Sequence, residues 1–406
     1  MHLLAGSDGL TTLFRQIAAV TAMNMRSLPQ RVGTSLVVVI GIAGVVAVLI
    51  SVLSLATGLA RTLSSTGRPE RAIILYAGSQ SEVESNLPRD AVLTLANLPG
   101  IKRDSDGKPL VSADALASMW LPTRATGAPG SATFRGVSAP SLAVRPEVKL
   151  LQGRLFQSGV RELIVGTAAQ SKFRGLEPGS RVISNGTEWQ VVGVFESNGD
   201  AHESELLADA DTLLSAYHRT TFNSVTVWLE SPAAFDTLKA SVTTNPTLTM
   251  DVQREAVYYE RQSKRFSTFL AVVANVIAVV MAIGAIFGAL NTMYSAVSAR
   301  SVEIATLRAI GFGSAGVVVS VLVESLSLAV IGALIGAAAA WLVFNGNTVS
   351  TIAGTSGFTQ VAFHLRISLD LVVIGVLWAC AVGLVGGLFP SIRAARWPVA
   401  QALRAT

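Results

Sequence analysis

The sequence predicts a membrane protein in which four transmembrane α-helices carry a large α+β domain, inserted between the first helix and the second. Three observations predict this fold class. Half of the 406 residues are hydrophobic and only 14% are charged, whereas soluble proteins carry about 25% charged residues. Four segments are apolar over a length that can cross a bilayer, which takes roughly 20 helical residues. Between the first two of these segments lies a long region of ordinary soluble composition.

The four apolar segments are the predicted transmembrane spans. They cover residues 32–60, 266–299, 314–344 and 371–392. The first span is much longer than the apolar core of a cleaved signal peptide, which has about 7–15 residues, so we expect it to be an uncleaved anchor. All four spans contain more than one glycine, and small residues allow close approach of helices in lipid.

Basic residues predict the orientation, because they resist translocation. Those that flank the spans on one side are Arg15, Arg26, Arg31, Arg300, Arg308, Arg393, Arg396 and Arg404. Both termini are therefore predicted to lie in the cytoplasm. Residues 1–31 would contain an interfacial elbow helix at 10–28, residues 393–406 would form a cytoplasmic tail, and residues 345–370 would form a periplasmic loop.

The composition also excludes several classes of protein. The formal charge of +5 shows no clustering that would favour nucleic-acid binding, and the mean hydropathy of +0.52 points to lipid instead. The single cysteine, Cys380, lies within an apolar run, so the chain can form neither an intrachain disulfide nor a thiolate metal cluster.

The inserted region, residues 61–265, is long enough to bury its own core. Strands are predicted at 71–77, 132–137, 162–166, 180–184, 187–195, 224–229 and 248–253. Helices are predicted at 88–98, between 166 and 173, after Pro232, and from Arg254 into the second span. Asn185-Gly186 predicts a tight hairpin, because both central positions of a type I′ turn need positive φ.

No catalytic, metal or cofactor site is predicted on this chain. His202 and Glu205 have a spacing that could ligate a metal, but further histidines at ligand spacing are missing, and the acidic patch formed by Glu203, Glu205, Asp209 and Asp211 is interpreted as a solvated loop. No nucleophile elbow or phosphate-binding loop occurs: Lys108 follows a glycine, but Pro109 then stands at the hydroxyl position. Any ATP must be hydrolysed by a partner.

After the second span, residues 300–313 predict a short amphipathic helix on the cytoplasmic side. Its characteristic residues are Glu303, Ile304, Leu307, Arg308, Ile310 and Gly311. Apolar residues three and four positions apart form one face of such a helix, and glycines end it. The spacing alone leaves two interpretations open: a helix that lies in the membrane interface, or one that docks into a groove on a soluble partner.

Four motifs carry a family resemblance. The chain reads E-I-A-T-L-R-A-I-G-F at 303–312, and F-P-S-I-R-A-A-R-W-P-V-A-Q-A-L-R at 389–404. These resemble the signature of the FtsX/MacB-type (type VII) permeases of ABC transporters. The stretch 153–179, with V-V-G-V-F at 191–195, resembles the MacB periplasmic core domain. The resemblance covers nearly the whole chain. This chain departs from MacB itself because it has no fused ATPase domain, which favours the split-gene branch, with DevC-like and LolC/LolE-like members.

The resemblance implies a permease of the inner membrane that forms a homodimer and binds two copies of a separate ABC ATPase, which holds ATP and Mg. It implies mechanotransmission, in which the ATPase cycle moves the periplasmic domains and drives efflux with a periplasmic adaptor (membrane fusion protein) and an outer-membrane channel. It assigns ATPase coupling to the helix at 303–311. Lipoprotein or lipid extraction, and FtsX-like regulation of a cell-wall hydrolase, remain alternatives.

Two further features are predicted from the residues. The run 251–266 contains neither Gly nor Pro, so we expect a helical stalk that includes Tyr259, Glu260 and Arg261 and continues into the second span. Glu324 lies well inside the third span, where a carboxylate is costly. We expect it to have a structural role facing the dimer or bundle interior, with a proton relay as the alternative.

Overall fold

The structure is a computed structural model, and it describes residues 18, 21–23, 32–310, 313–350 and 361–396. The chain divides into two compact units. The helical unit contains residues up to 56, 268–346 and 365 onward, and the sheet unit contains residues 57–267 and 347–364. Two helices, α2 (Val32–Thr66) and α8 (Glu255–Ala299), are continuous across this division.

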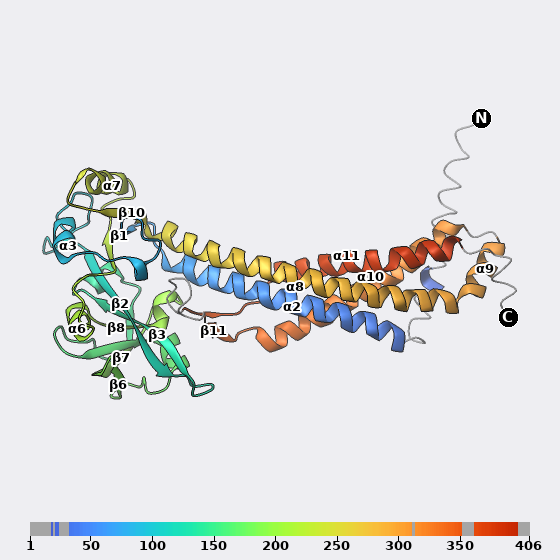
Figure 1. Cartoon of the computed structure of the whole chain (residues 1–406), viewed down its shortest axis with the longest axis horizontal. Helices are drawn as coiled ribbons and strands as arrows, with labels where there is room; N and C mark the ends of the chain where they lie inside the picture. Colours follow the sequence, from blue (N-terminus) through green and yellow to red (C-terminus); the bar gives the residue numbers. More distant parts are fainter. Residues whose placement is uncertain (1–17, 19–20, 24–31, 311–312, 351–360, 397–406) are drawn as a thin grey trace. The chain divides into compact units, whose positions relative to one another are not determined.

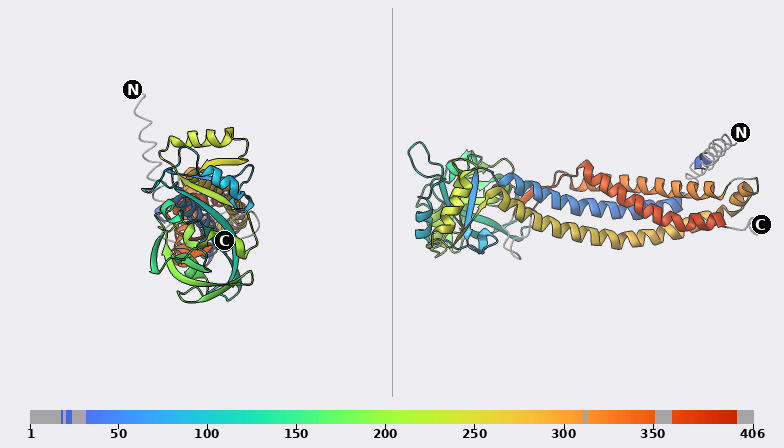
Figure 2. Two further views of the ribbon diagram at one scale, coloured as in Figure 1. Left: turned by 90° about the vertical axis from the view of Figure 1, so that its left-hand side faces the viewer. Right: turned by 90° about the horizontal axis from the view of Figure 1, so that it is seen from above.

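The helical unit confirms the four predicted spans. Its helices are α2, α8, α10 (Ser314–Phe344) and α11 (Leu369–Arg396), with the short α9 (Ser301–Ala309) between α8 and α10. Within the described residues these four long helices have the length and apolar composition to cross a membrane. Within this unit they run side by side in both views (Figures 1 and 2). The predicted elbow helix at 10–28 falls almost entirely outside the described residues.

Glycines set the spacing between the helices of this unit. A Cβ atom added to Gly336 would lie 2.3 Å from the backbone oxygen of Ala43 in α2, and one added to Gly332 would lie 2.8 Å from that of Val39. Between α11 and α10, a Cβ at Gly383 would lie 2.7 Å from Ala329. Since real Cβ contacts are longer, only glycine permits these distances, as expected for helices packed in lipid.

One face of α8 differs from these packed surfaces. Added Cβ atoms at Gly284 and Gly288 would meet nothing within 4 Å. Large apolar side chains near them are exposed, including Val280 at 65% and Phe287 at 67%. This face of α8 is therefore covered by no described part of the chain.

The sheet unit is built on one mixed sheet. Its strands are β1 (Arg71–Tyr76), β2 (Val111–Pro122), β3 (Pro129–Val137), β4 (Lys149–Gly153), β5 (Glu162–Gly166), β6 (Arg181–Ser184), β7 (Thr187–Glu196), β8 (Glu205–Asp209), β9 (Ser224–Trp228) and β10 (Met250–Arg254). Their order is β10-β1-β9-β2-β3-β8-β5-β7-β4, and β6 pairs with β7. The pairs β3–β8 and β5–β7 are parallel and the others are antiparallel, so the unit is α+β, as predicted.

Short helices and turns connect these strands. They are η2 (Glu82–Glu84), α3 (Arg89–Leu95), α4 (Ser141–Val144), α5 (Thr167–Lys172), η3 (Ala201–Ser204), α6 (Ala210–Ala216) and α7 (Ala234–Thr244). A small hairpin, β11 (Thr348–Ser350) with β12 (Ala362–His364), also belongs to this unit. At the centre of the core, the rings of Phe134 and Trp189 make an edge-to-face contact with centroids 4.8 Å apart.

The structure confirms the predicted hairpin and corrects three other predictions. Asn185 and Gly186 have φ values of 48° and 71°, and they join β6 to β7. The acidic patch predicted as a solvated loop instead spans η3, β8 and the start of α6; Glu205 and Asp209 are buried, whereas Asp211 is exposed as predicted. The stalk predicted over 251–266 starts as strand β10, and its helix begins at Glu255. The strands β2, β4 and β8 were not predicted.

Candidate functional site

The short helix predicted after the second span is present as α9. The chain leaves α8 at Ala299, turns at Arg300, and re-enters a helix from Ser301 to Ala309. Glu303 lies in its first turn and Arg308 in its last, where each charge is favoured by the helix dipole. The helix ends before Ile310, so it is slightly shorter than predicted.

The predicted coupling residues have different environments. Ile304 packs, partly buried, on a cluster formed by Val297, Val317, Val321 and Ala394. Glu303 is exposed, and Ile310 is 69% exposed. The side chain of Leu307 is not described, and Gly311 lies outside the described residues. One side of α9 is therefore anchored on the helical unit, while Ile310 at its end faces outward.

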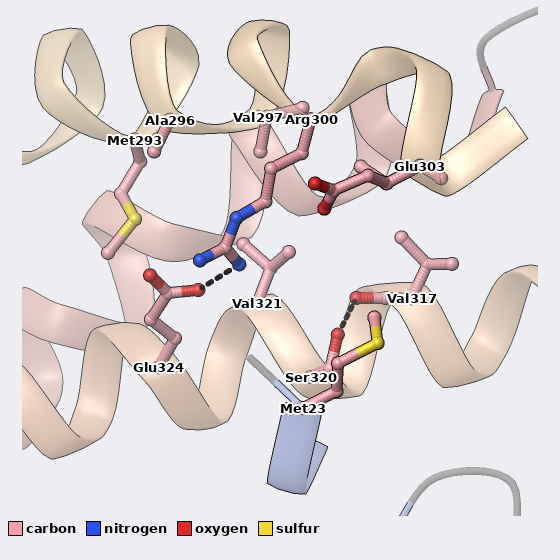
Figure 3. A pocket seen from close by; sticks show the side chains of 11 residues that line it. Met23, Met293, Ala296, Val297, Arg300, Glu303, Val317, Ser320, Val321 and Glu324 are labelled. Carbon is pink, nitrogen blue, oxygen red and sulfur yellow. Dashed lines mark hydrogen bonds and ion pairs between the residues drawn. The ribbon is translucent and has the colours of Figure 1, made fainter. Parts of the chain in front are cut away.

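An ion pair that the sequence analysis did not predict lies beside α9. The guanidinium of Arg300 donates to the carboxylate of Glu324 in α10 over 3.4 Å, and both residues are 6% exposed. A cavity of about 20 Å³ adjoins the pair and is also lined by Glu303, Met23 and Met293 (Figure 3). The pair ties the turn between α8 and α9 to α10.

The expected structural role of Glu324 is consistent with this geometry. A carboxylate buried among transmembrane helices is costly unless it is paired. Removing one partner of a buried ion pair is strongly destabilising, because the other charge is then left uncompensated. The Arg300–Glu324 pair can therefore hold the start of α9 in one position relative to α10.

In the sheet unit, Arg71 joins the end of α2 to the start of α8. It is fully buried at the first position of β1, and its Nε donates to Glu255, the first residue of α8, over 2.6 Å. Its Nη2 donates to the backbone oxygen of Thr66, the last residue of α2, over 3.2 Å. Its Nη1 donates to Glu147 over 2.6 Å. We call Thr66, Arg71, Glu147 and Glu255 the junction.

Backbone packing makes the junction tight. An added Cβ at Gly67 would lie 2.5 Å from the Cα of Ala256, so the residue that follows α2 packs directly on the first turn of α8. The backbone N–H of Arg68 also donates to Glu255 over 2.9 Å. Burial opposes ionisation of Glu147, but Arg71 outweighs burial and lowers the pKa of its carboxyl. The ionised form of the Glu147 carboxylate beside Arg71 is therefore favoured.

The predicted stalk residues lie in the first turns of α8. Tyr259 is 8% exposed and makes an edge-to-face contact with Tyr258, whose hydroxyl accepts from the backbone N–H of Glu82 over 3.1 Å. Burial, reinforced by Glu82, raises the pKa of both phenols. Glu260 and Arg261 are exposed, and Arg261 donates to Gln253 over 3.2 Å. The first turns of α8 are thus packed on the sheet unit through the tyrosines.

A second buried arginine binds three carboxylates across the sheet. Arg135 in β3 donates to Glu205 over 2.8 Å, to Glu82 over 2.9 Å and to Asp114 over 3.1 Å. Arg145 donates to the same Asp114 over 2.6 Å. Burial would lower the pKa of Arg135, but the surrounding carboxylates raise it well above its ordinary value, so the protonated form of this guanidinium is favoured.

His202 connects this centre to the end of α2. The residue is 1% exposed and its Nδ1 lies 2.9 Å from Glu205, while no described group lies within hydrogen-bonding distance of its buried Nε2. The preceding residue, Ala201, donates its backbone N–H to the hydroxyl of Thr66 over 3.0 Å. Within the described residues, no group of three or more His, Cys, Asp or Glu could hold a metal ion. The geometry instead makes His202 part of the ion-pair network.

The sequence analysis missed Arg71, Arg135 and Arg145. The available signal was weak: Arg71 and Arg135 each lie in a correctly predicted strand whose other residues are mostly apolar or small. A charge at such a position indicates either an exposed strand face or a buried partner. Sequence alone does not identify that partner, because Glu255 lies 184 residues from Arg71.

Comparisons with known proteins agree with this organisation. A family model for the MacB-like periplasmic core domain matches residues 34–245, which is more than half of the chain, and one for the FtsX-like permease C-terminal region matches residues 275–399. The chain is 24% identical to the ABC transporter permease YknZ of Bacillus subtilis (strain 168), over 96% of this chain and 97% of that protein.

Two solved structures resemble the sheet unit more distantly. The extracellular domain of the transporter YknZ from Gram-positive bacteria is 20% identical, with 45% of this chain and 99% of that one covered and a TM-score of 0.35. The periplasmic region of MacB from Actinobacillus actinomycetemcomitans is 17% identical, with 48% and 92% covered and a TM-score of 0.36. The assignment rests on the two family models: the chain belongs to the FtsX/MacB-type permeases of ABC transporters.

Proposed function

We propose that this chain is the permease subunit that couples ATP hydrolysis by a separate ATPase to movement of the sheet unit. The observation that carries the proposal is the continuity of α8. This helix runs without a break from Glu255 in the junction to Ala299, one residue before the turn that leads into α9. A displacement of α9 is thereby passed along one helix to residues that are buried in the sheet unit.

The outward side of α9 is the proposed docking surface for the ATPase. Ile310 is an exposed apolar residue at the end of a short helix whose other side is held by Ile304 and by the Arg300 turn. An exposed apolar side chain next to charged residues suits the groove of a soluble partner. The ATPase would bind ATP and Mg²⁺, and this chain would contribute no catalytic group.

The uncovered face of α8 supports a second copy of the permease as partner. Gly284 and Gly288 are four residues apart within an apolar helix, the spacing at which two transmembrane helices approach closely. A homodimer would place two α9 helices against two ATPase subunits. The flanking arginines favour cytoplasmic termini and a sheet unit outside the cytoplasm. Export with a periplasmic adaptor and an outer-membrane channel is proposed from the family resemblance alone.

Affinity purification of the full chain from its own membranes in mild detergent tests this function. An ABC ATPase is expected to co-purify, and the chain freed of it is expected to hydrolyse no ATP. The variant Ile310→Asp should reduce the recovered ATPase about tenfold, while the matched change of another exposed isoleucine, Ile183→Asp in β6, should not. ATP turnover by the isolated chain, or equal recovery with both variants, would contradict the proposal.

A further inference from the structure

A groove of about 880 Å³ crosses one side of the sheet unit. Residues of α3, α6 and β2, the stretch 138–140 and the segment that precedes β5 line it. Ligand sites in proteins have roughly 300–1,000 Å³, so the groove has the size of a binding site for a molecule of several hundred daltons.

The surface of the groove is largely apolar. Val92, Val111 and Phe222 contribute buried side chains to it, and Ala96 and Ala216 contribute small ones. The side chain of Leu93 on α3 also lines it and is 64% exposed. This surface suits an apolar molecular body, because the transfer of such a body from water is favourable.

The charges that line the groove are unequally compensated. Asp211 pairs with Arg89, and Asp209 accepts from the backbone N–H of Thr212 over 3.0 Å. Within the described part of the chain, Lys108 and Arg161 have no carboxylate at ion-pair distance, although both line the groove. The groove therefore offers two cations to a ligand while its own carboxylates are occupied.

We propose that this groove captures the transported molecule, and that this molecule is an amphiphile with an apolar body and an anionic head such as a phosphate or carboxylate. The apolar lining would hold the body, and Lys108 and Arg161 would bind the head by charge-assisted hydrogen bonds. A cationic ligand fits less well, because Phe222 is the only aromatic residue among the described residues of the groove and Arg89 already lies over its ring, 5.1 Å from the centroid. The role in transport rests on the proposed permease function, whereas binding does not.

Photolabelling of the full chain tests the groove. The chain is reconstituted in phosphatidylcholine nanodiscs and irradiated with dodecyl phosphate that carries a diazirine on its alkyl chain, and adducts are mapped by mass spectrometry. Adducts are expected on α3 and α6. The uncharged dodecanol with the same diazirine should label these helices about tenfold less. Equal labelling by both probes, or no preference for these helices, would overturn the proposal.

Substitutions sharpen the test. The double variant Lys108→Gln/Arg161→Gln should lower labelling of α3 and α6 about tenfold. The control Lys239→Gln/Arg181→Gln removes one lysine and one arginine from exposed positions that do not line the groove, and it should label like the unchanged chain. An unaffected Lys108→Gln/Arg161→Gln variant would contradict the assigned head-group contacts.

Two further measurements distinguish the two possible sources of the ligand and distinguish failure of the groove proposal from failure of the permease proposal. A phosphatidate with the diazirine in its acyl chain, placed in the nanodisc, labels the groove if the occupant comes from the bilayer. Labelling by the alkyl phosphate alone indicates a soluble amphiphile, and either result supports the proposed chemistry. ATPase co-purification is measured on the same samples. Lost labelling with a bound ATPase contradicts only the groove, and a labelled groove without ATPase contradicts only the permease function.

Discussion

The two units of this protein bury charge to very different extents. Within the described residues of the helical unit, the buried charged side chains are Arg300 and Glu324, and close contact depends on glycine. The sheet unit buries a much larger set, namely Arg71, Glu82, Asp114, Arg135, Arg145, Glu147, Glu162, Asp200, His202, Glu205, Asp209 and Glu255. Shape therefore specifies the packing of the helices, whereas ion pairs between distant segments specify that of the sheet unit.

This difference follows from the surroundings of each unit. Between helices in lipid there is no hydrophobic driving force, so association relies on close van der Waals contact and small residues. In a water-exposed domain, buried ion pairs add little net stability, but breaking one is costly. A network such as that of Arg71 thus resists rearrangement at the junction, where α2 and α8 meet the sheet. The proposed function, in which the sheet unit is moved through its helices, requires such a junction.

The largest predicted effect is on the network in the sheet unit. Arg135→Ala leaves Glu82, Asp114 and Glu205 without their shared cation, and we expect a loss of about 3–5 kcal/mol in the free energy of unfolding. Denaturant unfolding of the purified chain, followed by tryptophan fluorescence, measures it. The control Arg181→Ala breaks the exposed pair with Glu188 and should cost at most about 1 kcal/mol. Equal losses of unfolding free energy in Arg135→Ala and Arg181→Ala would show that the buried network contributes no more to stability than an exposed ion pair.

The next effect separates packed from uncovered glycines. Gly336→Leu forces a side chain against the backbone of Ala43 and should destabilise the helical unit by about 1–3 kcal/mol or more. Gly288→Leu meets nothing within the chain, so its thermal stability in detergent should change by no more than about 0.5 kcal/mol. The same variant should weaken self-association, measured by cross-linking. Similar destabilisation by both variants would contradict the difference between the two helix faces.

The ion pair of the helical unit is predicted to have an intermediate effect. Glu324→Gln and Arg300→Gln should each destabilise the chain, and the double variant should be less destabilised than the sum, with a coupling energy of about 0.5–3 kcal/mol. The double-mutant cycle is measured by unfolding and, in parallel, by ATPase stimulation in the complex. If the losses in unfolding free energy of the two single variants simply add up in the double variant, the two side chains do not interact. Unchanged stimulation of the ATPase by Glu324→Gln would exclude a role of the Glu324 charge in that stimulation.

The smallest predicted effect is a pH dependence from His202. Burial would lower the pKa of its imidazole, but Glu205 and then Asp200 outweigh burial and raise it, with Arg145 opposing them. A raised pKa means that the stability contributed by protonated His202 is complete below the unfolded-state pKa of about 6.5 and is lost as the pH rises through the native-state value.

This dependence is isolated by comparing the chain with His202→Gln. Other groups of the network titrate too: Glu82, Glu147 and Glu205 have lowered pKa values and reduce stability on acidification, while the pKa of Asp200 is raised by burial. The difference in unfolding free energy between the two proteins should therefore shrink as the pH is raised above about 6.5. A difference that is constant with pH would show that His202 does not change its protonation on unfolding.

Features with a local cause were predictable from the sequence. Apolar length gave the four spans, and Asn185-Gly186 gave the hairpin between β6 and β7. The spacing of the apolar residues predicted α9, although Ile310 of the predicted apolar face is 69% exposed. Each of these depends on neighbouring residues only, so local pattern is sufficient.

Features that join distant segments were not predictable. Glu205 was interpreted as solvated because it lies in an acidic stretch, yet its partner Arg135 lies 70 residues away and neutralises it inside the sheet. The partners of Arg71 are equally remote. Glu324 could be recognised as unusual, but the proximity of Arg300 depends on how α9 folds back. The groove lined by α3 and α6 likewise appears only when the sheet order is known.

The central claim is that α8 transmits movement from α9 to the sheet unit. For the test, a spin label is attached to Lys239→Cys in a Cys380→Ser background, and the chain is studied in complex with the co-purifying ATPase. The distance between the labels of two copies is measured with and without ATP. The exposed stalk residues Glu260 and Lys264 are replaced either by two alanines, which favour helix, or by two glycines, which disfavour it by about 1 kcal/mol each. We predict an ATP-dependent shift in distance with alanine and its loss with glycine, at unchanged ATP hydrolysis. The same shift in both variants would contradict transmission through α8.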